Sequence, residues 1–343
     1  MIRYNNDYNH GAHPAILEAL AATNDTAYGG YGLDEWCEKA ENEIQKYLQC
    51  PRAKIHFMLG GTQVNYTVIA AALRPYESVI CADTGHINVH ETGAVENTGH
   101  KIEVVPHKNG KISAEQIAAV AENFRTSGVQ EHITEPRMVY ISSPTEYGTI
   151  YYKEELRAIR KVCDEYGLYL FMDGARMGYG LGAPDCDITL KDLGALTDVF
   201  YIGGTKCGAL FGEAVVLVNP ALQHSFRSYM KQNGGMLAKG WLLGLQFATL
   251  FENGLYFEIT ERADRYAVRI KEAFAKKGIP SYIESSTNQQ FVVVDEVTKA
   301  KLAENFIFEE EGRTEEGSII RFCTSWSTKE EEVDALAAGI LAL

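Results

Sequence analysis

The sequence of 343 residues lacks any run of about 18 apolar residues, the length that a membrane-spanning helix needs. Its first 14 residues, MIRYNNDYNHGAHP, contain no apolar stretch typical of a secretory signal peptide. Basic runs are also absent, and 32 Lys and Arg residues stand against 46 Asp and Glu residues, a net charge of −14. Because nucleic acids and anionic membranes are bound through clustered cations, we expect neither as a partner.

The sequence also lacks the cysteine and histidine patterns of disulfide frameworks and metal sites. The seven cysteines are odd in number and form no C-x-x-C motif, so the sequence predicts a cytoplasmic protein with reduced thiols. His86 and His90 are four residues apart beside Glu91, but there is no H-E-x-x-H motif and no third ligand, so we expect no metal site. The densest acidic cluster, at residues 309–311, is interpreted as a solvated loop.

Hydrophobic residues make up 46% of the chain and charged residues 23%, which is typical of folded proteins. Short apolar runs predict strands over residues 55–59, 78–82, 102–105, 138–142, 168–172, 199–202 and 214–218, and helical patterns lie between them at 62–73, 113–124 and 153–166. This alternation predicts an α/β large domain over residues 26–220, with a mostly parallel seven-stranded sheet. The last two strands are joined by a short segment, so we expect an antiparallel edge pairing there.

The pattern changes after Pro220. Two long helical patterns, 222–251 and 255–277, are followed by short strand candidates at 281–283, 291–294 and 318–323 and by a final helix from residue 328. We predict an interdomain helix and a smaller α+β C-terminal domain over residues 221–343. Residues 1–25 are expected to form an N-terminal arm that contributes to the small domain and the active site.

Three segments that follow predicted strands carry residues suited to chemistry. Gly60-Gly61-Thr62-Gln63 precedes a helix, whose free N–H groups favour an anion, although the same residues suit an ordinary turn. Asp173 ends a buried strand and either meets a ligand, caps a helix or pairs with Arg176. Lys206 follows another strand among small residues; it is either a desolvated nucleophile or a surface lysine.

Taken together, these segments suit pyridoxal 5'-phosphate (PLP), because an open parallel sheet binds ligands at the carboxyl ends of its strands. The glycine-rich turn would hold the phosphate, Asp173 would keep the pyridine nitrogen protonated, and Lys206 would form the Schiff base. His86 follows another strand, where its ring can stack on the cofactor. Arg321, in the strand-like IIRFCTSW, is either an anchor for a substrate carboxylate or part of an internal ion pair.

Over nearly its whole length the sequence resembles the threonine aldolase family of fold type I PLP enzymes, which is grouped with the β-eliminating lyases. The resemblance rests on an N-terminal Asn-Asp, Tyr28-Gly29, GGTQ, GHINVHETGA, MDGAR, the GGTK segment and RFCTSW. It implies an aspartate aminotransferase-like large domain and a PLP cofactor. It also implies a homodimer or homotetramer with active sites at the dimer interface, into which Tyr28 reaches from the neighbouring subunit.

The resemblance also implies roles for individual residues. Lys206 matches the Schiff-base lysine, Asp173 the partner of the pyridine nitrogen and His86 the ring-stacking histidine. Further cofactor-binding positions are Gly61, Thr62, Thr205 and Arg176. Arg176 and Arg321 match the arginines expected near the cofactor's phenolic oxygen and the substrate carboxylate.

Two motifs depart from the family pattern. The common Ser-Asp-Thr is replaced by Asn6-Asp7-Tyr8, so Asn6 would take the serine's place near the carboxylate. A Thr-His-Asn-Gly stretch is replaced by Thr145-Glu146-Tyr147-Gly148, which resembles a phenylserine-aldolase-like subgroup. We therefore expect Glu146, His86 or a water molecule held by them to accept the proton of the substrate's β-hydroxyl group.

The resulting expectation is a low-specificity L-threonine aldolase-like lyase. It would cleave L-threonine, L-allo-threonine or a related β-hydroxy-α-amino acid into glycine and an aldehyde. A PLP-dependent β-eliminating lyase or aminotransferase acting on another amino acid is the alternative. A non-enzymatic binder of a phosphate-bearing ligand is a more distant one.

Overall fold

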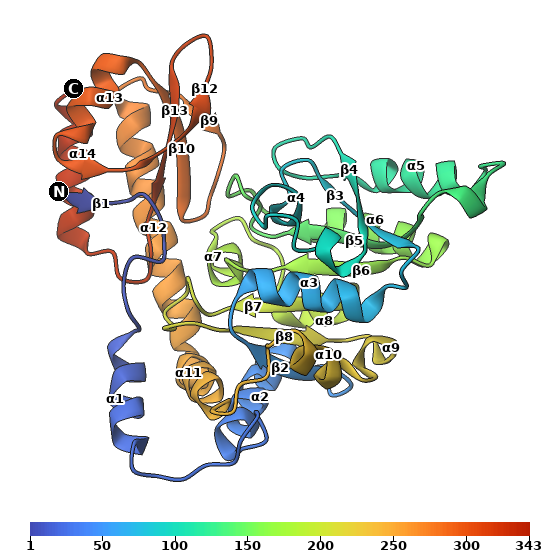
Figure 1. The fold of residues 1–343 in the computed structure, drawn as a ribbon. Coiled ribbons are helices and arrows are strands. Elements are labelled where there is room, and N and C mark those ends of the chain that lie inside the picture. Colours follow the sequence, from blue (N-terminus) through green and yellow to red (C-terminus); the bar gives the residue numbers. More distant parts are fainter.

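The computed structural model describes residues 1–343 and is built around a seven-stranded sheet with the order β2-β8-β7-β6-β5-β3-β4 (Figure 1). Its strands are β2 (Lys54–Met58), β3 (Glu77–Ala82), β4 (Lys101–Val105), β5 (Glu135–Ser142), β6 (Tyr169–Asp173), β7 (Val199–Gly203) and β8 (Glu213–Leu217). Only β8 runs antiparallel to its neighbours, so the predicted mostly parallel, seven-stranded sheet is confirmed.

The edge placement of the last two strands was wrong. β7 and β8 do pair antiparallel, but β8 lies inside the sheet because β2 pairs along its other side. The short β7–β8 connection determines their relative direction. It carries no information about β2, whose residue Met58 pairs with the distant Glu213.

Both faces of the sheet are buried, which explains the continuous apolar runs in its strands. In β3, Val79 and Cys81 belong to one core cluster, whereas Ile80 and Ala82 belong to the other. The helices of this part are α2 (Glu35–Leu48), α3 (Gly61–Ala72), α4 (His86–Val89), α5 (Ala114–Arg125), α6 (Lys153–Tyr166), α7 (Met177–Gly182) and α8 (Leu190–Leu196).

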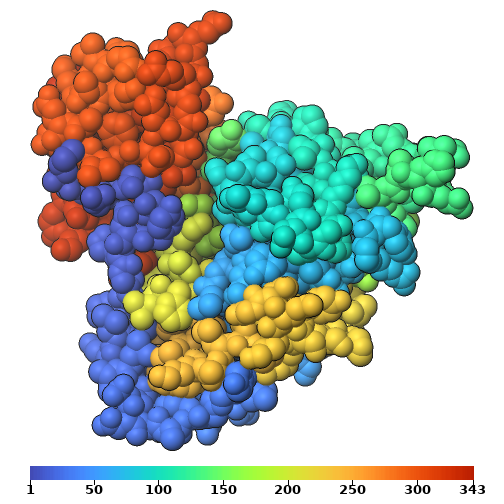
Figure 2. Space-filling view, viewed as in Figure 1, coloured from blue at the N-terminus to red at the C-terminus, as the bar shows by residue number.

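The C-terminal part has its own antiparallel sheet, with the order β12-β13-β10-β9, and its own core cluster. The strands are β9 (Ser281–Ile283), β10 (Gln289–Val294), β12 (Glu309–Arg313) and β13 (Ser318–Cys323), and the helices are α13 (Glu296–Ala303) and α14 (Glu330–Leu341). Figure 2 shows this part as a separate lobe, at the upper left, beside the larger body.

The N-terminal residues lie against this C-terminal lobe. β1 (Ile2–Arg3) pairs parallel with β11 (Phe306–Ile307), and Tyr4 is buried in the C-terminal core cluster. Farther along, α1 (Pro14–Thr23) leaves the lobe and lies beside the larger part of the molecule (Figure 1).

One long helix, α12 (Leu255–Lys276), joins the two parts. Its residue Ile259 packs in the large core, whereas Ile270 and Phe274 pack in the C-terminal core. The helical pattern at 222–251 is broken more often than its sequence suggests, since it forms α9 (Pro220–Gln223), α10 (Phe226–Gln232) and α11 (Trp241–Phe251). Ser225 and Gly234 adopt positive φ angles, which end a regular helix.

The acidic run at 309–311 is not the solvated loop predicted from its charge. It forms the outermost strand β12, in which Glu310 pairs with Lys299 and Glu311 with Arg321. Exposed charges are typical both of loops and of edge strands, so composition alone does not separate the two. None of the helices has the length and apolar character needed to span a membrane.

Candidate active site

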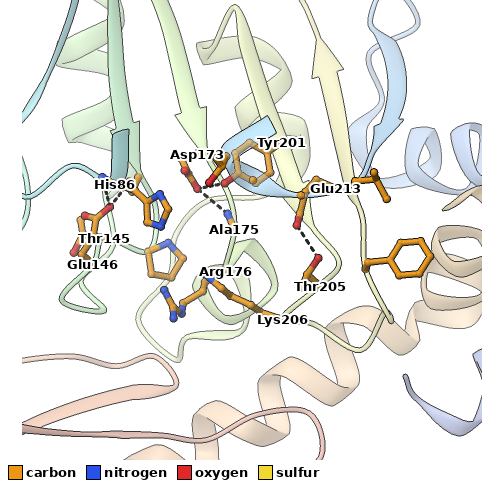
Figure 3. Close-up of a pocket in the computed structure, with 17 residues that line it drawn as sticks. His86, Thr145, Glu146, Asp173, Ala175, Arg176, Tyr201, Thr205, Lys206 and Glu213 are labelled. Atoms are coloured by element: carbon orange, nitrogen blue, oxygen red, sulfur yellow. Dashed lines mark hydrogen bonds between the residues drawn. The ribbon is translucent and has the colours of Figure 1, made fainter. Parts of the chain in front are cut away.

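A cavity of about 250 Å³ opens where the parallel strands of the large sheet end (Figure 3). Because β2, β5, β6 and β7 all run in one direction, the residues that follow them meet at this edge. β8 runs in the opposite direction and therefore contributes its first residue instead. The lining residues that bear polar or charged groups are Thr62, His86, Ser142, Thr145, Glu146, Asp173, Arg176, Tyr201, Thr205, Lys206 and Glu213.

Asp173 at the end of β6 is buried and surrounded by hydrogen-bond donors. The hydroxyls of Tyr140 and Tyr201 each donate to it at 2.5 Å, Asn65 Nδ2 donates at 3.1 Å and the amide of Ala175 at 2.9 Å. Burial acts to raise the pKa of Asp173, but His86 and the two tyrosines outweigh it, and the net shift is downward. Asp173 is thus a buried carboxylate held ionised, not a partner of Arg176.

The turn after β2 leaves the start of α3 open to the cavity. Gly60 is the N-cap residue, and no side chain accepts a hydrogen bond from the first helical turn. Gly61 and Thr62, which line the cavity, therefore present N–H groups to an anion. A Cβ on Gly61 would lie only 2.9 Å from the Tyr201 hydroxyl. The absence of a side chain at Gly61 therefore lets the turn lie close to Tyr201, which donates to Asp173.

Lys206 follows β7 and lines the same cavity as Asp173. Burial and the nearby positive charge of Arg176 lower the pKa of its amine, while Asp7, Asp173 and Glu213 oppose that shift. The amine makes no salt bridge of 4.0 Å or less. These surroundings favour a neutral amine, the form that reacts with a carbonyl group.

Glu213 was not anticipated from the sequence. Its carboxylate accepts the Thr205 hydroxyl at 2.8 Å and the Gly204 amide at 3.1 Å, and burial raises its pKa to about 8. Thr205, predicted to bind the cofactor, lines the cavity, but its hydroxyl proton is already donated to Glu213. In the sequence, Glu213 is marked only as a single acidic residue at the start of the apolar run EAVVLV.

His86 and Glu146 lie together on another wall of the cavity. The backbone amide of His86 donates to Glu146 Oε1 at 3.1 Å, and the Ser142 hydroxyl donates to the same oxygen at 2.9 Å. Burial, aided by the charge of Asp173, raises the pKa of Glu146. A carboxylate so perturbed is a stronger base than an exposed one.

His86 also has a partner that the sequence did not reveal. Its Nδ1 lies 2.8 Å from Oε1 of Glu91, an oxygen that also accepts from Asn65 Nδ2 at 2.8 Å. Burial acts to lower the pKa of His86, but the Glu91 bond and the charge of Asp173 prevail and raise it. Asn65 thus connects the partner of His86 with the carboxylate of Asp173.

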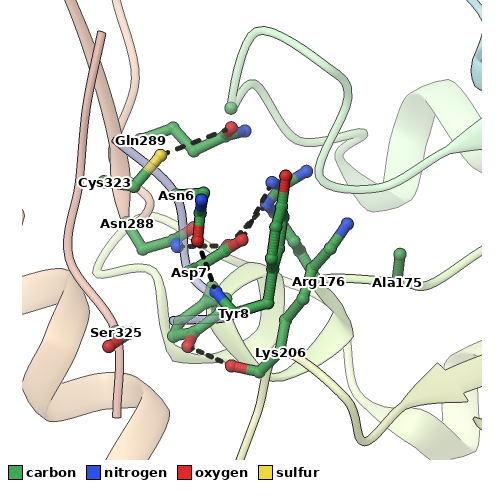
Figure 4. A network of polar contacts seen from close by, with 12 residues as sticks. Asn6, Asp7, Tyr8, Ala175, Arg176, Lys206, Asn288, Gln289, Cys323 and Ser325 are labelled. Atoms are coloured by element: carbon green, nitrogen blue, oxygen red, sulfur yellow. Dashed lines mark hydrogen bonds and ion pairs between the residues drawn. The ribbon is translucent and has the colours of Figure 1, made fainter. Parts of the chain in front are cut away.

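Asp7 from the N-terminal arm neutralises Arg176 (Figure 4). Its Oδ2 lies 2.7 Å from Arg176 Nε and its Oδ1 3.0 Å from Nη2, and Asn288 Nδ2 donates to Oδ2 at 2.9 Å. Burial would raise the pKa of Asp7, yet Arg176 and Lys206 lower it to about 2. Sequence reasoning considered Asn6 and overlooked Asp7 beside it.

Three predicted site residues lie outside the cavity lining. Arg321 is paired with Glu311 at 2.8 Å, and Asn6 accepts a hydrogen bond from the backbone of Tyr8. Tyr28 packs on Trp241, with ring centroids 4.9 Å apart. Within one chain, the structure therefore groups Lys206, Asp173, His86, Glu146, Gly61, Thr62, Thr205 and Arg176, and leaves these three apart.

The chain is similar to known proteins over nearly its whole length. The chain is 30% identical over 351 aligned positions to the low-specificity L-threonine aldolase of Pseudomonas sp. (strain NCIMB 10558), covering 99% of this chain and 97% of that protein. Its structure matches a threonine aldolase of Leishmania major with a TM-score of 0.96 and 42% identity, covering 99% of this chain and 98% of the other.

More distant structures share the fold alone. The histidinol-phosphate aminotransferase of Clostridium acetobutylicum matches with a TM-score of 0.74 at 14% identity, over 100% of this chain and 98% of that one. The predicted fold type I architecture of PLP enzymes is therefore confirmed.

The sequence model of the β-eliminating lyase family matches residues 10–297, and membership of this family implies a PLP cofactor. This match spans most of the chain, and the chain therefore belongs to the β-eliminating lyase family.

Proposed function

We propose that the protein is a PLP-dependent aldolase that cleaves L-threonine, L-allo-threonine or a related β-hydroxy-α-amino acid into glycine and an aldehyde. The observation that carries this proposal is the meeting of Asp173, Lys206 and Glu146 in one cavity. Similarity to proteins named threonine aldolases, over nearly the whole chain, supports the same reaction.

The residues of the cavity fit the cofactor. The uncapped start of α3, at Gly61 and Thr62, suits the phosphate, and the ionised Asp173 suits a protonated pyridine nitrogen. The lowered pKa of Lys206 suits a Schiff-base amine, and His86 lines the wall on which the ring would stack. When bound, PLP supplies an electron sink for the electrons of the broken bond.

The protein's own groups then have distinct tasks. Asp173 keeps its negative charge through its buried donors, and Glu146 accepts the proton of the β-hydroxyl group. Arg321, with Asn6 and Arg176, orients the substrate carboxylate and so sets which bond at Cα is broken. His86, held by Glu91, is the second candidate for the proton acceptor.

We extend the proposal to a cytoplasmic homodimer or homotetramer in which Tyr28 reaches a neighbouring active site. Tyr28 lies between α1 and α2 on a segment without regular structure, which also exposes Tyr31 and Leu33. Exposed apolar side chains near each other are typical of interaction surfaces. Light scattering of the purified protein tests this part, and a monomer would contradict it.

The visible absorption spectrum of the protein with added PLP, alone and then with glycine or L-threonine, tests the function. We expect a bound-cofactor band that shifts with either amino acid, and release of glycine and an aldehyde from L-threonine. An oxo acid and ammonia as products would indicate an eliminating lyase instead. Lys206→Ala should lose both the lysine-linked band and turnover, and normal turnover in this variant would overturn the proposal.

A further inference from the structure

The two arginines expected to bind the substrate carboxylate already have carboxylate partners, but these partners differ. Asp7, the partner of Arg176, has a fully buried side chain and is also held by Asn288. Glu311, the partner of Arg321, keeps 32% of its side chain exposed and makes one ion pair, at 2.8 Å. Only Glu311 can therefore leave its arginine and enter water without breaking other contacts.

An irregularity of the backbone at Glu311 brings its carboxylate to Arg321. In the pairing of β12 with β13, Glu310 stands opposite Ile320 and Gly312 opposite Ile319, so Glu311 is the extra residue of a β-bulge. A bulge changes the direction of a side chain, and bulges are frequent beside active sites. Here the carboxylate of Glu311 meets Nη1 of Arg321 from the outermost strand.

Apart from Glu311, the guanidinium of Arg321 has few partners and can bind a further anion. The carbonyl oxygen of Asn5 accepts from its Nη2 at 3.1 Å, whereas its Nε is buried and has no partner. Asn5 lies two residues before Asp7, whose carboxylate pairs with the cavity residue Arg176, so the N-terminal arm links Arg321 to the cavity wall. The ion pair therefore stands beside the cavity and not on a remote surface.

We propose that Glu311 is a displaceable counter-ion of Arg321, which the α-carboxylate of the amino-acid substrate replaces on binding. Two carboxylates on one guanidinium repel each other, so the substrate and Glu311 compete for it. Glu311 thereby sets the affinity for amino acids without touching the bond that is cleaved. This inference rests on the proposed function, in which Arg321 receives that carboxylate.

The test is Glu311→Gln in the PLP-loaded enzyme, because glutamine keeps the size of the side chain and removes its charge. We expect the Kd for glycine, measured from the spectrum of the bound cofactor, and the KM for L-threonine to fall about threefold to tenfold. The kcat should stay within about twofold, since Glu311 does not act in the transition state. Unchanged glycine affinity, or weaker binding with a lower kcat, would overturn the inference.

Glu309→Gln is the matched control. Glu309 lies on the same strand, stands opposite Arg321 in the pairing and takes part in no salt bridge, so its removal changes the local charge equally. It should leave the glycine Kd unchanged. An equal effect of both variants would mean that Glu311 acts only as a nearby negative charge and not through its ion pair with Arg321. In an Arg321→Gln background, Glu311→Gln should have no effect on glycine binding.

Glycine binding also separates this inference from the proposed function. If the enzyme fails to cleave L-threonine while Glu311→Gln still tightens glycine binding, the aldolase proposal is wrong and the counter-ion role stands. If cleavage occurs and glycine binding does not change in the variant, the counter-ion role is wrong.

Discussion

Asp7 and Arg176, 169 residues apart in the chain, form a two-point ion pair with N–O distances of 2.7 and 3.0 Å. Arg176 belongs to the large domain, just after β6, whereas the arm that carries Asp7 is anchored in the C-terminal core through Tyr4. Asn288, immediately before β10, holds the same carboxylate. The pair therefore fixes the arm and the C-terminal lobe against the wall of the cavity.

Asp7→Asn should lower the free energy of unfolding by about 3–5 kcal/mol, because it leaves the buried Arg176 without its counter-ion. Urea unfolding of the cofactor-free protein measures the change. Asp25→Asn is the control, since Asp25 is exposed on the same N-terminal segment and makes no salt bridge. A loss below about 1 kcal/mol for Asp7→Asn would show that the pair does not hold the arm in place.

Glu213 should make stability fall as the pH rises. Burial raises its pKa from 4.5 to about 8, so the folded protein keeps a proton that the unfolded chain has released. Between about pH 4.5 and pH 8 this contribution to stability is progressively lost. The unfolding free energy of Glu213→Gln should depend less on pH over that window, and identical pH profiles would refute the assignment.

Glu146→Gln should reduce kcat for L-threonine cleavage by about 10²–10³-fold and leave the spectrum of the bound cofactor intact. The raised pKa of Glu146 also predicts that wild-type kcat increases with pH as this group ionises. Glu154→Gln, an exposed acid on α6, controls for the loss of one charge. A kcat within twofold of wild type would exclude Glu146 as proton acceptor and favour His86.

Two neighbouring glycines should respond differently to alanine. A Cβ on Gly61 would lie 2.9 Å from the hydroxyl of Tyr201, which is buried and bonded to Asp173, so Gly61→Ala should destabilise the cofactor-free protein by about 1–3 kcal/mol. Gly60 has an extended φ of −165° and no atom within 4 Å of its Cβ position, so Gly60→Ala should be neutral. Equal unfolding free energies for the two variants would contradict this reading.

Local patterns predicted much of the fold and several residues of the cavity. Strand ranges such as 199–202 and 281–283 agree with β7 and β9 within one residue, because apolar runs and their turns are encoded locally. Asp173 and Lys206 could be found because Asp173 ends a buried strand and Lys206 follows one, and parallel strands end at one edge. Glu213 was missed because it stands at the start of its strand, and only the reversed direction of β8 brings that start to the same edge.

The sequence by itself determined the alternation of strands and helices, the family and the residue types at the strand ends, since these depend on neighbours along the chain. Only the tertiary structure decided which charges meet: Asp7 with Arg176, Glu311 with Arg321 and Glu91 with His86. Asp7 and Arg176 are 169 residues apart in the chain, and the Glu311 contact needs a bulge that composition does not reveal. Ion pairs depend on distance in space, which the chain sets only after the arm, the large sheet and the C-terminal lobe have packed together.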